Sequence, residues 1–123
     1  MEEFELGAVQ ARFADIIWGN APLSSPELVR ICERELNWKK STTYTVLKKL
    51  CDKGLFKNEK GVVSALVSRD EYNSMKSACF VDETFSGSLP AFIAAFISNK
   101  AISPDEADEI QRMIDAFRRG EKE

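Results

Sequence analysis

Residues 38–56, WKKSTTYTVLKKLCDKGLF, carry the pattern that decides the fold. At about 100° per residue, one side of this stretch is suited to burial in a helix, and it holds Thr43, Val46, Leu47, Leu50 and Cys51. The opposite side is polar and holds Ser41, Thr42, Thr45, Lys48, Lys49 and Asp52. A capping hydroxyl at Ser41 or Thr42 predicts the helix start, and Gly54 predicts the end of the helix just after Lys53.

A second helix is predicted immediately before this one. Ser24, Pro26 and Glu27 supply a cap, a first-turn proline and an early acid, which predicts a helix over residues 26–36. Residues 37–40 then form a tight connection. An earlier amphipathic stretch, residues 5–18, ends at Gly19-Asn20 and predicts a helix whose Trp18 anchors its end in the core.

Two short runs of β-forming residues follow, at 55–59 and 62–67. The Lys60-Gly61 pair between them is typical of a tight turn, so the runs predict a two-stranded hairpin with a basic tip. The order helix, turn, helix, hairpin is that of a winged helix.

The rest of the chain predicts helices only. Ser68 caps a fourth helix that leads out of the winged helix. Two more helical patterns follow, one over residues 89–97 and one from Pro104 onward, which Ser103 caps. The predicted fold class is therefore mostly α with a small β-hairpin. Residues 1–68 are expected to form a winged helix-turn-helix DNA-binding head, and residues 69–123 a connector helix with a helical dimerisation tail.

The last two helices are too small to bury all their apolar residues against each other. We expect them to pack against a second copy of the chain, as a homodimer, through Phe92, Phe96, Ile97, Ile110, Met113, Ile114 and Phe117. A ligand pocket lined by Phe80, Phe85 and Phe92 is an alternative use of the aromatic residues, although such spacing is more often dimer core.

Charge is unevenly spread along the chain. The net charge is -3, yet residues 39–60 carry seven lysines against only Asp52 and Glu59. Residues 1–38 hold three basic against seven acidic residues, and residues 82–123 hold five against nine. One basic segment between acidic ones is typical of a protein that presents a single face to a polyanion.

The second helix of a helix-turn-helix lies in the major groove of double-stranded DNA. Thr42 and Thr45 are suited to base edges, because a hydroxyl donates or accepts and a methyl packs on thymine, whereas lysines are suited to phosphates. Tyr44 lies on the flank, where its phenol contacts DNA or its ring packs on the neighbouring helix. The predicted DNA-binding residues are Lys39, Lys40, Ser41, Thr42, Tyr44, Thr45, Lys48, Lys49, Lys57 and Lys60.

Other function classes are disfavoured. Histidine is absent, which removes the commonest general base and metal ligand, and the three cysteines are far apart, so we expect neither an enzyme, a metal site nor a cofactor. The opening MEEFELGAVQ is acidic where an export signal would be basic, and no long apolar run follows, so we expect a cytoplasmic protein without membrane insertion.

A docking module is the alternative to a DNA-binding protein. Many winged helices bind only proteins, and the basic face would then meet an acidic protein surface. The two hairpin lysines, Lys57 and Lys60, likewise have an alternative purpose, because lysines on a short hairpin prevent edge-to-edge pairing. Salt-sensitive binding to duplex DNA of defined sequence separates the two functions.

The stretch 38–56 resembles the penicillinase-repressor (BlaI/MecI/CopY) family of winged-helix transcriptional regulators. The resemblance extends into the C-terminal part, at SLPAFIAAF (88–96) and SPDE (103–106). It implies a homodimer that binds a palindromic operator, blocks transcription of β-lactam resistance genes and dimerises through the last helices.

The resemblance also implies an inactivation step. Family repressors are cleaved inside the first tail helix by a membrane sensor with a metalloprotease domain, and the matching bond here is Ala95-Phe96. Family members have asparagine where this chain has Ala95, which is a departure at the cleaved bond. The copper-responsive branch ends in cysteine pairs, which this chain lacks, so metal sensing of that kind is not expected.

Overall fold

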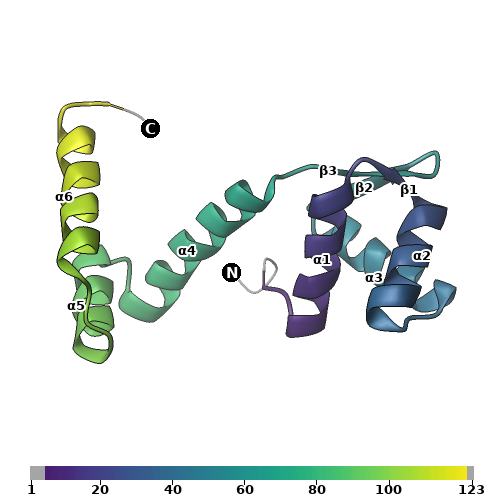
Figure 1. Cartoon of the computed structure of the whole chain (residues 1–123), viewed down its shortest axis with the longest axis horizontal. Helices are drawn as coiled ribbons and strands as arrows, with labels where there is room; N and C mark the ends of the chain where they lie inside the picture. Colours follow the sequence, from purple (N-terminus) through teal and green to yellow (C-terminus); the bar gives the residue numbers. More distant parts are fainter. Residues whose placement is uncertain (1–4, 122–123) are drawn as a thin grey trace.

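The computed structural model describes residues 5–121. It contains α1 (Ala8–Asn20), β1 (Leu23–Ser24), α2 (Ser25–Leu36), α3 (Lys40–Asp52), β2 (Phe56–Glu59), β3 (Val62–Ala65), α4 (Arg69–Phe85), α5 (Leu89–Asn99) and α6 (Pro104–Arg118). We call α1 to β3 the head, α4 the connector, and α5 with α6 the tail (Figure 1). The predicted fold class, mostly α with a small sheet, is confirmed. The first four residues, on which the expectation of no export signal partly rests, lie outside the described residues.

Four of the helices begin with a serine cap, and three of these caps were predicted from the sequence. The side chains of Ser24, Ser68, Ser88 and Ser103 each accept a hydrogen bond from a backbone N–H in the first turn. In α2, α4 and α6 a glutamate three residues on closes a capping box, which satisfies backbone donors that would otherwise lack partners. The first helix differs slightly from prediction, because Gly7 is extended and α1 starts at Ala8.

The sheet has three strands in the order β1-β3-β2, all antiparallel, so the prediction of a two-stranded hairpin was incomplete. Strand β1 pairs Leu23 with Val63 and has only two residues, too few for an alternating pattern to be visible in the sequence. The predicted turn is confirmed: Lys60 (φ 53°) and Gly61 (φ 78°) connect β2 to β3 in left-handed conformations. Such a two-residue turn matches the twist of paired strands.

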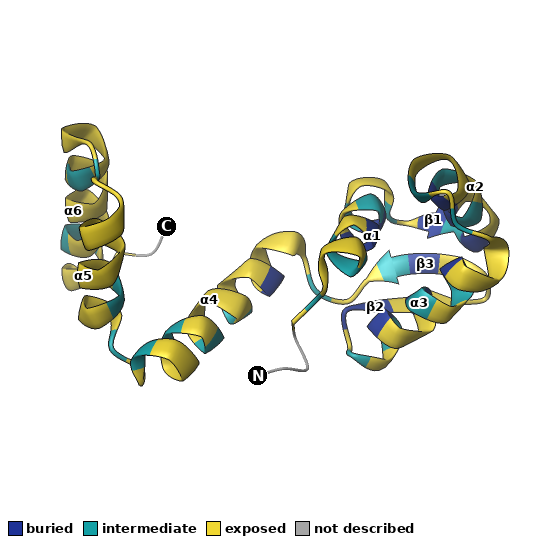
Figure 2. Cartoon of the chain, turned by 90° about the horizontal axis from the view of Figure 1, so that it is seen from below, coloured by how far each residue is buried: buried dark blue, intermediate teal, exposed yellow. Residues whose placement is uncertain are grey.

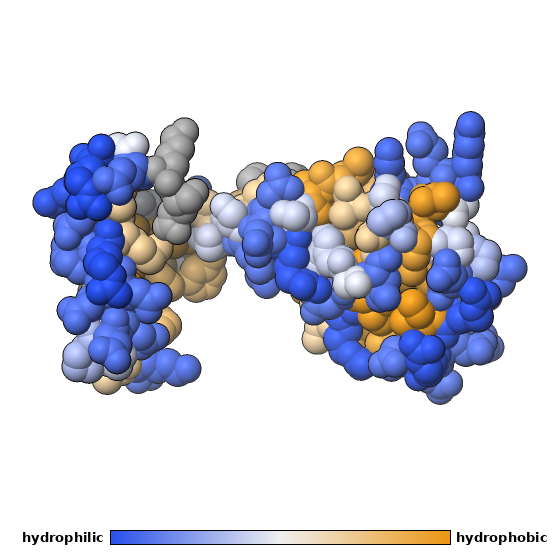
Figure 3. All heavy atoms as spheres, turned by 45° about the horizontal axis from the view of Figure 1, so that its top comes forward, coloured by the Kyte–Doolittle hydropathy of each residue, from blue (hydrophilic) through white to orange (hydrophobic). Residues whose placement is uncertain are grey.

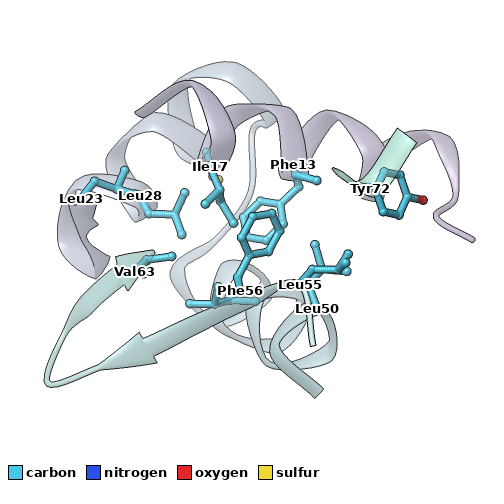
Figure 4. Packing of buried hydrophobic residues seen from close by; sticks show 12 residues of the cluster. Phe13, Ile17, Leu23, Leu28, Leu50, Leu55, Phe56, Val63 and Tyr72 are labelled. Atoms are coloured by element: carbon cyan, nitrogen blue, oxygen red, sulfur yellow. The ribbon is translucent and has the colours of Figure 1, made fainter. Parts of the chain in front are cut away.

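The core of the head lies between α1, α2, α3 and the sheet (Figure 4). Its largest fully buried side chains come from every one of these layers and include Phe13, Ile17, Leu28, Leu50, Leu55, Phe56 and Val63. Each such side chain contributes about 1.5–3 kcal/mol to stability by leaving water. Trp18 anchors the end of α1 as predicted, since its ring lies 5.2 Å from that of Phe56.

The connector leads away from the head and ends at the tail (Figure 1). Phe85 and Phe92 lie 5.7 Å apart between ring centroids and join α4 to α5. Most of the tail is exposed (Figure 2), and none of the residues of α5 or α6 is fully buried. Among the described residues no single helix is long and apolar enough to cross a membrane; α4 and α5 meet that test only as a pair, bent by 87°.

Candidate nucleic-acid interface

Helix α3 presents a polar face to solvent because its apolar face is locked into the head. Thr43, Leu47 and Leu50 are buried, and they pack with the core residues of α2 and the sheet. As predicted, the opposite side is exposed and holds Ser41, Thr42, Thr45, Lys48, Lys49 and Asp52. The rotation of α3 about its own axis is therefore fixed by burial, and the short hydroxyl side chains point away from the core.

The start of α3 differs from the prediction that Ser41 or Thr42 would cap it. Lys39 is the N-cap residue, in an extended conformation and without a side-chain capping bond. Ser41 and Thr42 therefore lie within the first turn, and their hydroxyls are not used to cap the helix. The first turn of a recognition helix is where base edges come within reach, so this change leaves both hydroxyls exposed at a favourable place.

Tyr44 packs its ring on the head and directs its hydroxyl at α2. The ring is half-buried against the core, and Oη donates a hydrogen bond to Ser25 Oγ at 3.0 Å. Of the two placements open from the sequence, packing on the neighbouring helix is the one seen in the free chain. A phenol that donates to Ser25 presents its remaining lone pair rather than its proton to any other partner.

Ser25 is a residue that sequence reasoning missed. It is buried, its backbone N–H donates to the carbonyl of Gly61 at 2.9 Å, and its hydroxyl accepts from Tyr44. It therefore joins three elements: the Lys60-Gly61 turn of the β2-β3 hairpin, which we call the wing, the start of α2 and the middle of α3. The only signal in the sequence was the pair Ser24-Ser25, of which capping accounted for the first member alone.

The wing holds two of the predicted lysines. Lys60 occupies the exposed tip, in the two-residue turn. Lys57 lies on β2 with its Nζ 3.8 Å from Oε1 of Glu59, and both side chains are largely exposed. An ion pair so exposed is weak, because water and salt screen it, and Lys57 can exchange Glu59 for another anion at little cost.

The other lysines of the basic segment do not all have the same surroundings. Lys39, Lys40 and Lys49 are exposed at α3. Lys48 Nζ lies 3.3 Å from Asp52 Oδ2, one turn further on, again between exposed groups. Lys53 is half-buried, and its Nζ donates to the carbonyl of Glu5 at 3.5 Å, so it points at the N-terminal segment. Six of the seven lysines are thus exposed at α3 or on the β2-β3 hairpin.

The thiols of Cys32 and Cys51 resist ionisation. Burial raises the pKa of the Cys32 thiol, with a hydrogen bond to Thr43 opposing the shift, and burial also raises the pKa of Cys51. A raised pKa keeps the thiol protonated, and the thiolate is the nucleophile and metal ligand. Cys32, Cys51 and Cys79 are all unpaired. Within residues 5–121 no group of three histidine, cysteine or acidic side chains is arranged to hold a metal ion.

The predicted dimerisation residues lie on the tail. Phe92 is half-buried in a cluster with Phe80 and Phe85, whereas the others are exposed: Phe96 (45%), Ile97 (44%), Ile110 (40%), Met113 (57%), Ile114 (44%) and Phe117 (80%). In Figure 3 hydrophilic residues cover the outer side of the tail, while apolar ones gather on the side toward the connector. A single chain leaves this apolar surface in water.

Comparison with known proteins shows the family of the chain. The family model described as penicillinase repressor matches residues 6–116, which include the head, the connector and nearly all of the tail. The chain belongs to the penicillinase repressor family. Members of this family are regulators rather than enzymes, in agreement with the expectation from composition.

Two relatives of this family member are similar along most of their length. The penicillinase repressor of Bacillus licheniformis is 22% identical over 112 residues, which cover 88% of each chain. The methicillin resistance regulatory protein MecI of Staphylococcus aureus is 20% identical over 115 residues, which cover 90% of this chain and 94% of the relative. The resemblance inferred from residues 38–56 is therefore confirmed.

Proposed function

We propose that the chain is a homodimeric repressor that acts in the cytoplasm and binds a palindromic DNA operator. In each copy, residues 1–68 would bind one half-site of the operator. Residues 69–123 would connect this part to the tail and pair the two copies. The observation that carries this proposal is the exposed face of α3, where hydroxyls and lysines lie opposite the buried Thr43, Leu47 and Leu50. A helix held in this way by a helix-turn-helix is suited to the major groove.

The contacts divide by chemistry. Ser41, Thr42 and Thr45 carry short exposed side chains that reach base edges, and they would read sequence. The long basic side chains would hold phosphates, from α3 through Lys39, Lys40, Lys48 and Lys49 and from the wing through Lys57 and Lys60. Tyr44, whose hydroxyl is bonded to Ser25, would lie beside the backbone at the edge of the interface.

The exposed apolar residues of the tail support the proposal of a dimer. Six of the seven predicted dimerisation residues are at least 40% exposed in one chain, on helices that bury nothing fully. Soluble proteins seldom leave so many large apolar side chains together in water, and a second copy covers them without a further partner. Two-fold pairing of the tails would place two heads on a palindrome, because the symmetry of such sites mirrors that of the dimer.

One titration tests this function. The purified chain first selects a DNA duplex from a random library. Its affinity for this duplex is then measured at two salt concentrations, with random duplex as competitor. Two chains per duplex, preference over competitor and a steep loss with salt are expected. Equal binding of all duplexes, together with salt-sensitive binding of an acidic protein, would instead support the docking module.

We propose the regulated genes from the names of the relatives, and the release from repression from the family resemblance. Their names refer to penicillinase and to methicillin resistance, and we extend to this chain the regulation of β-lactam resistance genes. We extend the cleavage step to the bond Ala95-Phe96, which lies exposed in the middle of α5. Cutting there would detach Phe96, Ile97 and all of α6 from the connector, and with them most of the dimer surface.

Cleavage has its own test. The purified dimer is incubated with a β-lactam and with membranes that contain a related sensor-protease. The masses of the products are then measured by mass spectrometry. A cut between Ala95 and Phe96 is expected. An Ala95→Asn variant, which restores the family residue, serves as a positive control for the sensor. An intact wild-type chain beside a cleaved Ala95→Asn chain would contradict cleavage of this member.

A further inference from the structure

The first turn of the connector is built into the head. Tyr72 is only 4% exposed, although it belongs to α4, and its ring lies 5.5 Å from that of Trp18. The indole N–H of Trp18 donates at 2.9 Å to the carbonyl of Val67, just before α4 begins. The start of α4 is therefore attached to the head by packing around Trp18.

Arg69 adds a second attachment on the outside of this packing. Its Nε lies 3.2 Å from Oδ1 of Asp15, a terminal nitrogen donates to the Asp15 carbonyl at 3.4 Å, and its guanidinium lies 5.8 Å from the centre of the Trp18 ring. The ion pair is half exposed, at 49% and 61%, so it adds little to folding stability. Three contacts from one planar group nevertheless restrain the angle between α1 and α4.

The far end of the connector packs on the tail. The rings of Phe80, Phe85 and Phe92 meet edge to face, with centroids 5.7–6.0 Å apart. Between these attachments α4 is one uninterrupted helix of 17 residues, Arg69–Phe85. Such a helix is about 25 Å long and behaves as a rigid rod. A rotation of about 10° at one end therefore displaces the other end by about 4 Å.

We infer that Arg69, held by Asp15 and Trp18, sets the angle between head and connector and so determines which spacing of half-sites the dimer accepts. The inference rests on the proposed function. Base pairs are spaced by about 3.4 Å along the duplex, so a displacement of about 4 Å shifts a head by more than one base pair. Arg69 is a positioning residue, since it acts through the orientation of the connector and contacts no base.

The test measures affinity against half-site spacing. The duplex selected by the wild-type chain is made with its spacing unchanged and with one or two base pairs added or removed. The wild type loses affinity by about tenfold or more at each altered spacing, because half-site separation is fixed by dimer geometry. Arg69→Ala and Asp15→Ala each flatten this profile to within about threefold, and the double variant flattens it no further.

Two controls separate positioning from other effects. Arg34→Ala removes another exposed arginine with an acidic neighbour, Glu35 at 3.2 Å, and leaves the profile as steep as in the wild type. A duplex with a single half-site is bound equally by wild type and Arg69→Ala. A steep profile in Arg69→Ala, or a loss on the single half-site, overturns the inference while the proposed function stands. Failure of the wild type to select any palindrome overturns both.

Discussion

The hydroxyl of Tyr44 donates a hydrogen bond to the hydroxyl of Ser25 at 3.0 Å, and this bond ties α3 to the first turn of α2. Ser25 is buried and also donates its backbone N–H to the wing turn at Gly61. The three elements of the candidate interface thus meet at one small residue. Their relative positions are fixed before any nucleic acid is bound, which reduces the conformational freedom lost on binding.

Removing either hydroxyl should weaken the head by a similar amount. Tyr44→Phe and Ser25→Ala are each expected to lower the free energy of unfolding by about 1 kcal/mol, since each deletes the same partly buried hydrogen bond. The double variant should lose little more than one single variant. Urea unfolding of the four proteins measures this. Losses that simply add would show that the two hydroxyls are energetically independent.

Threonine and lysine substitutions on α3 should differ in kind. Thr42→Ala or Thr45→Ala is expected to cost about 1–3 kcal/mol at one operator position and nothing on random duplex. Lys48→Ala should weaken binding to both by the same factor. Competition titrations against point-substituted operators give the comparison. Equal losses on specific and random duplex for the threonines would mean that they do not read bases.

The salt dependence should report the phosphate contacts. Replacing Lys39 or Lys49 by alanine is expected to reduce the slope of log affinity against log salt by about 0.9, the value for one phosphate contact on a duplex. Lys53→Ala is the matched control, because Lys53 is turned toward Glu5 and should leave the slope unchanged. Anisotropy titrations at several salt concentrations decide this, and an unchanged slope in the first two variants would remove them from the interface.

Sequence patterns predicted the helices well wherever a local signal exists. Ser24, Ser68 and Ser103 cap helices as expected, because a serine followed three residues later by glutamate satisfies backbone donors locally. The buried face of α3 followed equally from its spacing. These features depend on residues within one turn of each other.

Features that depend on distant residues could not be predicted. Strand β1 exists because Leu23 pairs with Val63, forty positions away, and two residues give no pattern of their own. The cap of α3 is Lys39 rather than Ser41 or Thr42, and it makes no side-chain capping bond that a sequence pattern could have indicated. The attachment of Arg69 to Asp15 is equally non-local.

A charge at the end of the tail should separate the copies. Phe117 is 80% exposed, so Phe117→Glu disturbs little within one chain but places a carboxylate in the expected dimer core. Sedimentation velocity should show a monomer at concentrations where the wild type is a dimer. Val9→Glu, at a position 52% exposed on the head, should leave the dimer intact. A dimer that survives in Phe117→Glu would place the interface elsewhere.

The buried thiol of Cys32 should be unreactive until the head unfolds. Burial holds its pKa above the ordinary value, so folding favours the neutral thiol. This favourable contribution is complete below the ordinary thiol pKa and is lost as the pH rises through the folded pKa. In a chain with Cys51→Ala and Cys79→Ala, labelling of Cys32 by a disulfide reagent should follow the unfolding rate. Rapid labelling of the native chain would mean that Cys32 is accessible.

The most direct test of a dimeric, sequence-reading repressor is the stoichiometry and salt dependence of binding to a palindromic duplex selected by the chain itself. Two chains per duplex, strong preference over random duplex and a steep decline with salt are predicted from the face of α3 and the exposed tail. One chain per duplex, or equal affinity for selected and random duplexes, would contradict the proposed function.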